Sequence, residues 1–212
     1  MAVHTRPRPT AFPYQDLLIQ VDPEVYDPAE DTYLLLDSLH PHPKEKVLEI
    51  GTGCGIIALS CAKDGADVVA SDCNPHAVRN CRHNIEQNKA RLQGSIEVRL
   101  GDLFTVVQPD ERFDLILFNP PYVPTAEGES VEPWLDTATG GGPDGLQVTS
   151  RFITEVRRFL TPTGQTYIIV SSQSPPEAVS LLLRRGRLDG CIVGRHRLED
   201  EEIRCYRLTP AD

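Results

Sequence analysis

Long apolar runs and an excess of basic residues are both missing from this sequence of 212 residues. No apolar stretch approaches the ~18 residues that a membrane-spanning helix needs, and residues 1–10 contain no hydrophobic core of a signal peptide. Lys and Arg number 21 against 31 Asp and Glu, so the formal net charge is -10. A field of this sign repels polyanions and anionic membrane surfaces, which argues against generic nucleic-acid binding. These features predict a soluble cytoplasmic protein.

Paired cysteines are missing as well. The six cysteines include no Cys-x-x-Cys pair, so their spacing suggests neither a zinc site nor a small disulfide scaffold. We expect them to be reduced, and we expect no metal site.

The basic residues include two arginine-rich stretches, residues 184–187 and 195–197, which we interpret as a solvated helix end and a strand edge. None of the six histidines joins a motif, and none is assigned a catalytic role.

Strand-like apolar runs alternate with amphipathic helical stretches, which indicates an α/β fold with a parallel sheet covered by helices on both faces. The length suits one well-buried domain, which we assign to residues 20–212, after a loosely ordered leader of residues 1–19. The last two strands lie close enough together to form an antiparallel hairpin. The expected strands span residues 46–50, 67–71, 95–100, 113–118, 165–170, 188–195 and 203–208, and the expected helices span residues 28–39, 56–63, 75–88, 146–160 and 176–185. We place Asp27 at the N-cap of the first helix and Pro28 in its first turn.

The most informative segment is Asn119-Pro120-Pro121-Tyr122, which follows the apolar run of residues 113–118. Two prolines have fixed φ and no N–H, so the chain must turn out of the sheet here. The Asn119 side-chain oxygen and the Pro120 carbonyl then offer two acceptors to one NH2 group, and Tyr122 offers a flat face. This arrangement favours a planar amide or amine as the ligand. The alternative is a plain proline-terminated strand.

Residues 123–144 follow this turn and show no sustained periodicity, although they exceed the usual length of a connection. We expect the segment to face a substrate. It contains Trp134, the acidic residues Glu127, Glu129 and Glu132, and the hinge-like stretch of residues 140–142. Trp134 could equally pack into the core, and the glycines could form a flexible connector.

A second motif, the turn of residues 51–55, places glycines at positions 51, 53 and 55 between a buried strand and a helix. Such a turn lets a ligand approach the backbone and face the helix N-terminus. The spacing departs from the dinucleotide fingerprint, and Glu49 at the strand end would repel a phosphate. A cationic ligand with an amino group and a sulfonium fits better.

Two further strands of the predicted sheet end in carboxylates. Asp72 lies about twenty residues past the glycine turn, where an acidic residue typically binds ribose hydroxyls. Asp102 ends the next strand, where it can accept a hydrogen bond from an exocyclic amine. Each residue alone could be a helix cap or a solvated loop charge. Together with Glu49 they predict a site for a nucleoside that carries a positive charge.

These motifs resemble a known family. Residues 49–55 resemble the first motif of class I S-adenosylmethionine-dependent methyltransferases, and residues 119–122 resemble their amino-methylating signature. Residues 25–36 resemble the HemK-type glutamine methyltransferases of translation release factors, and residues 141–145 resemble a Gly-Gly-x-x-Gly element of their short eukaryotic and archaeal branch. The resemblance extends from Gln20 to Leu208 and consists of four motifs in order.

The resemblance implies a seven-stranded, mostly parallel Rossmann-like methyltransferase sheet with helices on both faces and a terminal antiparallel hairpin. It also implies the cofactor S-adenosyl-L-methionine, and methyl transfer to the glutamine amide in the Gly-Gly-Gln loop of a class I release factor. It implies a heterodimer with a small zinc-binding activator protein, in place of the N-terminal helical domain of bacterial relatives. The implied catalytic residues are Asn119, Pro120, Pro121 and Tyr122, and the implied cofactor-binding residues are Tyr26, Pro28, Glu30, Thr32, Glu49, Gly51, Gly53, Gly55, Asp72, Cys73, Asp102, Leu103 and Asn119.

Three alternatives stay open at this stage. An N6-adenine methyltransferase would use the same turn but would have to flip the base out of its stack, and the acidic balance disfavours nucleic acid. A lysine methyltransferase would need a base to deprotonate the amine, and no such base stands out. A scaffold protein that has lost catalysis would keep the glycine turn but not the Asn-Pro-Pro-Tyr turn, and both are intact here.

Overall fold

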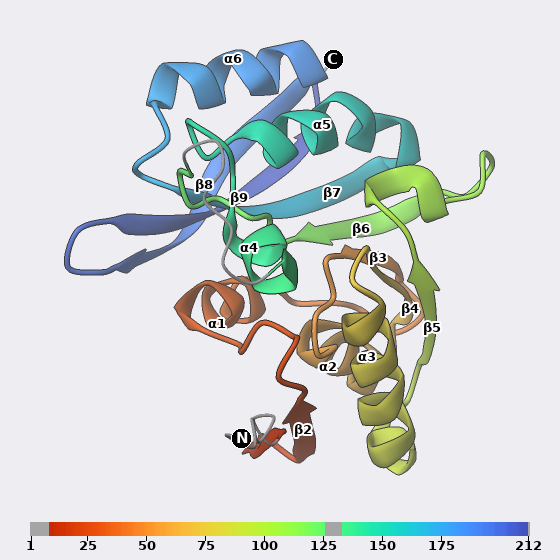
Figure 1. Cartoon of the computed structure of the whole chain (residues 1–212). Coiled ribbons are helices and arrows are strands. Elements are labelled where there is room, and N and C mark those ends of the chain that lie inside the picture. The colour runs from red at the N-terminus through yellow and green to blue at the C-terminus, as the bar shows by residue number, and fades with distance from the viewer. Residues whose placement is uncertain (1–8, 126–132, 212) are drawn as a thin grey trace, which may run out of the picture.

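A seven-stranded sheet in the order β5-β4-β3-β6-β7-β9-β8 forms the centre of the computed structural model, which describes residues 9–125 and 133–211 (Figure 1). Five neighbouring strands are parallel, β9 is antiparallel to both of its neighbours, and β8 and β9 form the terminal hairpin. The strands are β3 (Lys46–Ile50), β4 (Asp67–Asp72), β5 (Ser95–Leu100), β6 (Phe113–Phe118), β7 (Leu160–Ser171), β8 (Leu188–Arg197) and β9 (Glu202–Pro210). This topology confirms the predicted fold class.

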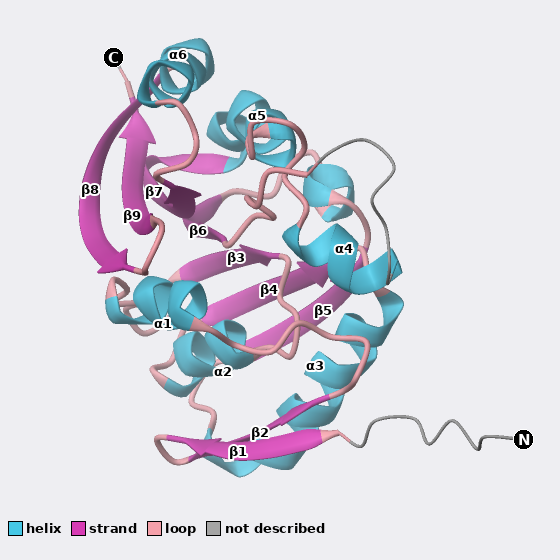
Figure 2. Cartoon of the chain, turned by 60° about the vertical axis from the view of Figure 1, so that its left-hand side comes forward, coloured by secondary structure: helices cyan, strands magenta, loops and turns pink. Residues whose placement is uncertain are grey.

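Helices cover both faces of the sheet (Figure 2). Successive residues of a strand point to opposite faces, so Val47 and Leu115 pack in one hydrophobic cluster while Leu48 and Ile116 pack in the other. The first cluster includes residues of α1 (Glu30–Asp37), α2 (Ile56–Lys63) and α3 (Pro75–Asn88), and the second includes residues of α5 (Gln147–Glu155) and α6 (Pro176–Gly186). A further short helix, α4 (Pro133–Thr139), lies in the segment after β6.

Two predicted helix boundaries are wrong. The first helix begins at Glu30 with Ala29 as its N-cap, and neither Asp27 nor Pro28 belongs to it. The helix predicted for residues 146–160 ends at Glu155 and continues as a 3-10 turn over Val156–Phe159 before β7 begins. Pro162 lies inside β7, where the fixed φ of proline and its restriction of the preceding residue favour extended backbone.

The expectation of a loosely ordered leader is wrong for residues 10–19. β1 (Thr10–Tyr14) and β2 (Leu17–Val21) form an antiparallel hairpin, and Leu17, Ile19 and Val21 are buried in the same hydrophobic cluster as α2. Alternate residues of β2 therefore contribute to the core. Residues 1–8 lie outside the described part of the chain.

Across residues 9–125 and 133–211, none of the helices combines the length and the apolar character that crossing a bilayer requires.

Candidate functional site

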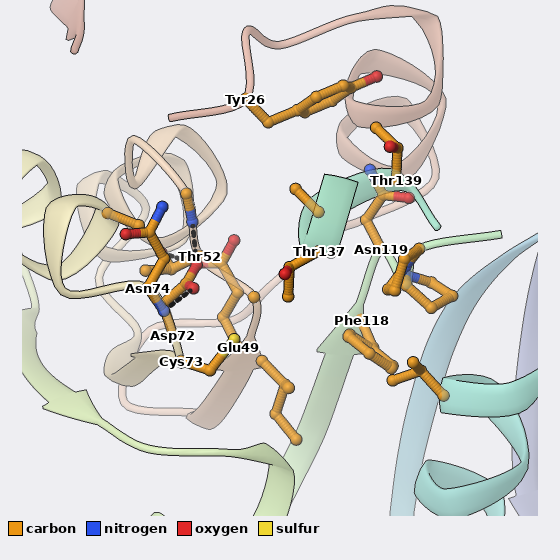
Figure 3. Close-up of a pocket in the computed structure, with 18 of the residues that line it drawn as sticks. Tyr26, Glu49, Thr52, Asp72, Cys73, Asn74, Phe118, Asn119, Thr137 and Thr139 are labelled. Carbon is orange, nitrogen blue, oxygen red and sulfur yellow. Dashed lines mark hydrogen bonds between the residues drawn. The ribbon is translucent and has the colours of Figure 1, made fainter. Parts of the chain in front are cut away.

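A cavity of about 240 Å³ lies at the carboxyl ends of the parallel strands β3, β4, β5 and β6. The chain runs from β3 outward to β4 on one side, while β6 lies on the other side, so the strand order reverses at this point. Crevices at such reversals are the usual ligand sites of open α/β sheets. Figure 3 shows Glu49 and Asp72 on one side of the cavity and Asn119 and Phe118 on the other.

The glycine turn between β3 and α2 supplies backbone to the cavity wall. Gly51, Gly53 and Gly55 have φ values of 71°, 55° and 88°, which other residues adopt only with strain. The Gly53 N–H donates to Asp72 Oδ2 at 2.9 Å, which links the turn to the end of β4. Gly51 and Gly53 line the cavity but Gly55 does not. A Cβ at Gly55 would lie 2.6 Å from Cys81 Sγ, so this glycine permits close packing of α2 against α3.

One carboxylate of the site is buried and a second is half-buried. Glu49 is 2% exposed and accepts a hydrogen bond from Thr52 Oγ1 at 2.7 Å, and burial raises its pKa to about 8. Burial also raises the pKa of Asp72, although Asp72 accepts from the backbone N–H of Asn74 at 2.8 Å. Neither carboxylate forms an ion pair with a basic residue in the described part of the chain. The cavity therefore holds two acidic groups without a protein cation beside them.

Asp102 differs from these two residues because it is half-exposed and paired. Its carboxylate forms an ion pair with Arg151 of α5, and Arg151 also lines the cavity. An exposed pair of this kind contributes little to stability, about 0–1 kcal/mol. The carboxylate can therefore exchange this partner for a ligand at small cost.

The Asn119 side chain carries an unused acceptor. Its Oδ1 atom is buried and has no hydrogen-bond donor among the described residues. Buried polar atoms are nearly always paired, because an unpaired one costs about 1–3 kcal/mol. All four residues of the Asn-Pro-Pro-Tyr turn line the cavity, so this acceptor belongs to a residue of the cavity wall.

Asp31, which the sequence analysis did not assign to the site, joins the turn to α1. Its buried carboxylate accepts hydrogen bonds from the Tyr122 hydroxyl at 3.1 Å, the Tyr26 hydroxyl at 3.3 Å and the Thr32 N–H at 2.6 Å. Burial, followed by the charge of Asp31, raises the pKa of both tyrosines. Both therefore remain neutral and donate. Asp31 lies inside the motif of residues 25–36, but its partner Tyr122 is 91 positions away.

The structure brings most of the predicted site residues to the cavity and leaves two outside it. Glu30 is exposed and, like Gly55, does not line the cavity. The predicted residues that do line it are Tyr26, Pro28, Thr32, Glu49, Gly51, Gly53, Asp72, Cys73, Asp102, Leu103, Asn119, Pro120, Pro121 and Tyr122.

Helix α4 adds a wall that the sequence analysis did not resolve. Trp134 and Thr137 line the cavity, and the Trp134 ring lies 6.3 Å from the ring of His76 on α3. The segment after the Asn-Pro-Pro-Tyr turn thus contributes to the cavity. Its three predicted acidic residues, Glu127, Glu129 and Glu132, lie outside the described residues.

Comparisons with known proteins agree with this geometry. Residues 25–134 match the family model described as Methyltransferase small domain. A Methanocaldococcus jannaschii protein with the provisional name protein N5-glutamine methyltransferase is 42% identical over 159 residues, which cover 74% of this chain and 78% of the relative. Human Methyltransferase HEMK2 is 31% identical over 196 residues, which cover 88% of this chain and 90% of the relative.

A solved structure is similar in fold over nearly its whole length. It is the E. cuniculi Mtq2–Trm112 complex, described as responsible for the methylation of the translation termination factor eRF1. The match has a TM-score of 0.67 and 25% sequence identity, and it covers 89% of this chain and 99% of that chain.

Proposed function

This chain belongs to the HemK-type methyltransferases of the methyltransferase small-domain family, and from that premise we propose that it transfers a methyl group to the side-chain amide nitrogen of a glutamine. The proposed acceptor is the glutamine in the Gly-Gly-Gln loop of a class I translation release factor. The activity described for the E. cuniculi complex, methylation of a termination factor, supports this acceptor.

The buried, unpaired Oδ1 atom of Asn119 is the observation that carries the proposal. A primary amide brings two N–H donors on one nitrogen, and Asn119 Oδ1 accepts one of them. The Pro120 carbonyl is the proposed acceptor for the other. A glutamine amide is a weak nucleophile because its lone pair is delocalised into the carbonyl. Acceptance of both hydrogens raises the electron density on nitrogen and directs the lone pair into the cavity, so positioning and electrostatics carry the transfer without a nearby general base. The nitrogen keeps one hydrogen, and the other is released as a proton to solvent.

The proposed cofactor of the cavity is S-adenosyl-L-methionine. When bound, the cofactor supplies an electrophilic methyl group on a positively charged sulfonium. The buried Glu49 and the half-buried Asp72 form no ion pair with a basic residue among the described residues, which suits a cationic ligand. Because Gly51 and Gly53 have no side chains, the cofactor can approach the backbone of the turn closely. Asp102 is available to accept a hydrogen bond from the exocyclic amine of the cofactor. Tyr26, Pro28, Thr32, Cys73 and Leu103 complete the proposed cofactor-binding set.

A small activator protein is the proposed partner of this chain in a heterodimer. The E. cuniculi relative was solved as a complex with Trm112, and the HemK-type resemblance implies that such an activator binds zinc. β5 is an outer strand of the sheet, and Leu100 at its end is 57% exposed. An uncovered edge strand with an exposed apolar residue is a surface that a partner can protect. The proposed compartment is the cytoplasm.

Mass spectrometry tests the proposed reaction. A release factor is incubated with this chain, the candidate activator and S-adenosyl-L-methionine, and we expect one added methyl on the glutamine of the Gly-Gly-Gln loop. A methyl on lysine, or on adenine of added nucleic acid, with none on glutamine would contradict the proposal.

Two variants separate catalysis from cofactor binding. Asn119→Ala removes one acceptor of the substrate NH2 but leaves Glu49 and Asp72 in place, so turnover should fall by roughly 10²-fold or more while cofactor affinity changes little. Asp72→Ala should weaken cofactor binding by calorimetry at least tenfold, about 1.4 kcal/mol. Near wild-type turnover of Asn119→Ala would mean that the Asn-Pro-Pro-Tyr segment only ends the strand and has no catalytic role.

A further inference from the structure

Three asparagines on α3 form one buried row that faces β2. Asn80, Asn84 and Asn88 recur every four residues, so they lie on one face of the helix. All three side chains are buried, and Asn84 and Asn88 have no exposed surface. Buried amides of this kind need hydrogen-bond partners, and we refer to the three residues as the asparagine ladder.

The asparagine ladder binds the backbone of β2 as a neighbouring strand would. Asn88 accepts from the Leu18 N–H at 2.9 Å and donates to the Leu18 carbonyl at 2.8 Å. Asn84 makes the same pair of bonds with Gln20, at 3.0 and 2.7 Å. Asn80 accepts from the Asp22 N–H at 2.9 Å. Because β1 pairs with the other edge of β2, the ladder satisfies the edge that β1 leaves open.

Asn84 makes one bond that the other members of the ladder do not. Its Nδ2 atom also donates to the carbonyl of Cys54 at 2.8 Å, inside the glycine turn of residues 51–55. The corresponding atom of Asn88 donates instead to the Asn84 carbonyl of its own helix at 2.8 Å. Asn84 and Asn88 are therefore matched in residue type, burial and contact with β2, and they differ in contact with the turn.

The N-terminal end of α3 makes a second connection to the same segment. Asn74, the N-cap of α3, donates from Nδ2 to the Glu24 carbonyl at 2.8 Å, two residues before Tyr26. The backbone N–H of Asn74 donates to Asp72 Oδ1 at 2.8 Å. The chain from β2 to Tyr26 is thus held by α3 at both ends, next to the glycine turn and next to Asp72.

We propose that Asn84 is a positioning residue of the cofactor cavity. Its side chain holds the glycine turn against β2, and in this way it also positions the segment that leads from β2 to Tyr26. The inference rests on the proposed function in that the cavity ligand is S-adenosyl-L-methionine. Without the Asn84 amide, the buried Cys54 carbonyl and the Gln20 N–H would lose their hydrogen-bond partner, while the Gln20 carbonyl would keep its bond from Asn80 Nδ2 at 2.9 Å. The glycine turn would then no longer be bonded to β2 through Asn84.

Calorimetry with S-adenosyl-L-methionine compares Asn84→Ala with its control Asn88→Ala, and urea unfolding measures the stability of both. We expect both variants to lose stability, because Asn88→Ala removes both hydrogen bonds to the Leu18 backbone and Asn84→Ala removes those to the Gln20 N–H and the Cys54 carbonyl. We expect the dissociation constant to rise about tenfold in Asn84→Ala and less than about threefold in Asn88→Ala, since the control leaves the Cys54 bond intact. Equal weakening of cofactor binding in the two variants would mean that Asn84 has a structural role alone.

A second measurement needs no cofactor. The Gly55 N–H donates to the Thr52 carbonyl at 2.8 Å within the turn, and its hydrogen exchange should be faster in Asn84→Ala than in Asn88→Ala. If Asn84→Ala does not fold, Asn84→Ser, which keeps one short donor, replaces it in both measurements. Equal Gly55 exchange in the two variants overturns the inference. Failure of the wild-type chain to bind S-adenosyl-L-methionine contradicts the proposed function and leaves the exchange comparison valid.

Discussion

Asp31 is the residue on which the two tyrosines of the cavity converge. From the sequence, Tyr122 is assigned a flat face, and its hydroxyl is given no role. The structure gives that hydroxyl a partner, because it donates to the buried Asp31 carboxylate at 3.1 Å. Asp31 has no ion pair within the described residues, so the hydrogen bonds from Tyr122, Tyr26 and Thr32 satisfy its buried carboxylate. The hydroxyl therefore stabilises the position of the catalytic turn relative to α1.

Tyr122→Phe tests this contact at the residue scale. The change keeps the ring but removes one donor from a buried carboxylate, so unfolding by urea should require about 1–2 kcal/mol less free energy. Turnover at saturating cofactor should fall several-fold. The control Tyr26→Phe loses the longer bond to Asp31, 3.3 Å, and should cost less stability. Wild-type stability and turnover in Tyr122→Phe would show that the ring alone matters.

Glu49 makes the stability of the protein depend on pH. Burial raises its pKa from the ordinary 4.5 to about 8, so between these values the folded state holds a proton that the unfolded state has lost. The free energy of unfolding should therefore decrease as pH rises from about 5 to 8. Glu49→Gln cannot ionise, and urea unfolding at pH 5, 6.5 and 8 should show a shallower decrease for the variant than for the wild type. Parallel pH profiles would mean that Glu49 is already ionised in the folded protein at neutral pH.

At the scale of elements, the Gly-Gly-x-x-Gly segment packs against the backbone of the catalytic turn. The Gly141 N–H donates to the Val123 carbonyl at 2.8 Å, and the Val123 N–H donates to the Thr139 carbonyl at 2.9 Å. Gly145 has a φ of 71°, and a Cβ there would lie 2.4 Å from the Tyr122 carbonyl oxygen. The backbone after the Asn-Pro-Pro-Tyr turn can approach this closely because Gly145 has no side chain.

Gly145→Ala should therefore displace the turn. Positive φ costs a non-glycine residue about 1–2 kcal/mol, and the collision with Tyr122 adds to that cost. We expect turnover to fall at least about tenfold, by analogy with other misplaced catalytic groups. Gly65→Ala is the matched control, because Gly65 also has positive φ, 97°, but its Cβ would approach Pro43 away from the cavity. It should lose stability and keep its turnover. Equal effects of the two substitutions on turnover would contradict the docking role of Gly145.

At the scale of the whole molecule, the two edges of the sheet differ in how they are protected. β8 pairs with β9 through a register shift between Ile192 and Gly194, and irregularities of this kind blunt an edge. β5 pairs with β4 without such a shift and ends at the exposed Leu100. The β5 edge is therefore the better surface for the proposed activator protein.

Co-expression tests this assignment. The chain expressed alone should aggregate or lose activity, and the activator should restore both properties. Leu100→Glu places a charge on the proposed interface and should abolish co-purification with the activator, whereas Val193→Glu, at an exposed apolar position on β8, should not. A soluble and fully active isolated chain would contradict the need for a partner.

The sequence by itself determined the elements whose local signals are strong. The predicted bounds of β3, β5, α2 and α3 agree with the structure, because apolar periodicity, the glycine turn and Pro75 act within a few residues of the backbone they shape. The sequence also predicted that Glu49, Asp72 and Asp102 would meet. Parallel strands end at one edge of a sheet, so residues just past those ends converge wherever the strand order is right.

Tertiary structure decided the contacts that no local pattern encodes. Asp31 meets Tyr122 across 91 positions, and Asn84 holds Gln20 across 64. The hairpin of β1 and β2 shows the same dependence, since one edge of β2 is satisfied by side chains of α3 that follow it by about 60–70 residues. A buried aspartate or asparagine is costly until its partners arrive, and those partners are specified by how helices and strands pack. The positioning of the cavity walls therefore became visible only in the folded chain.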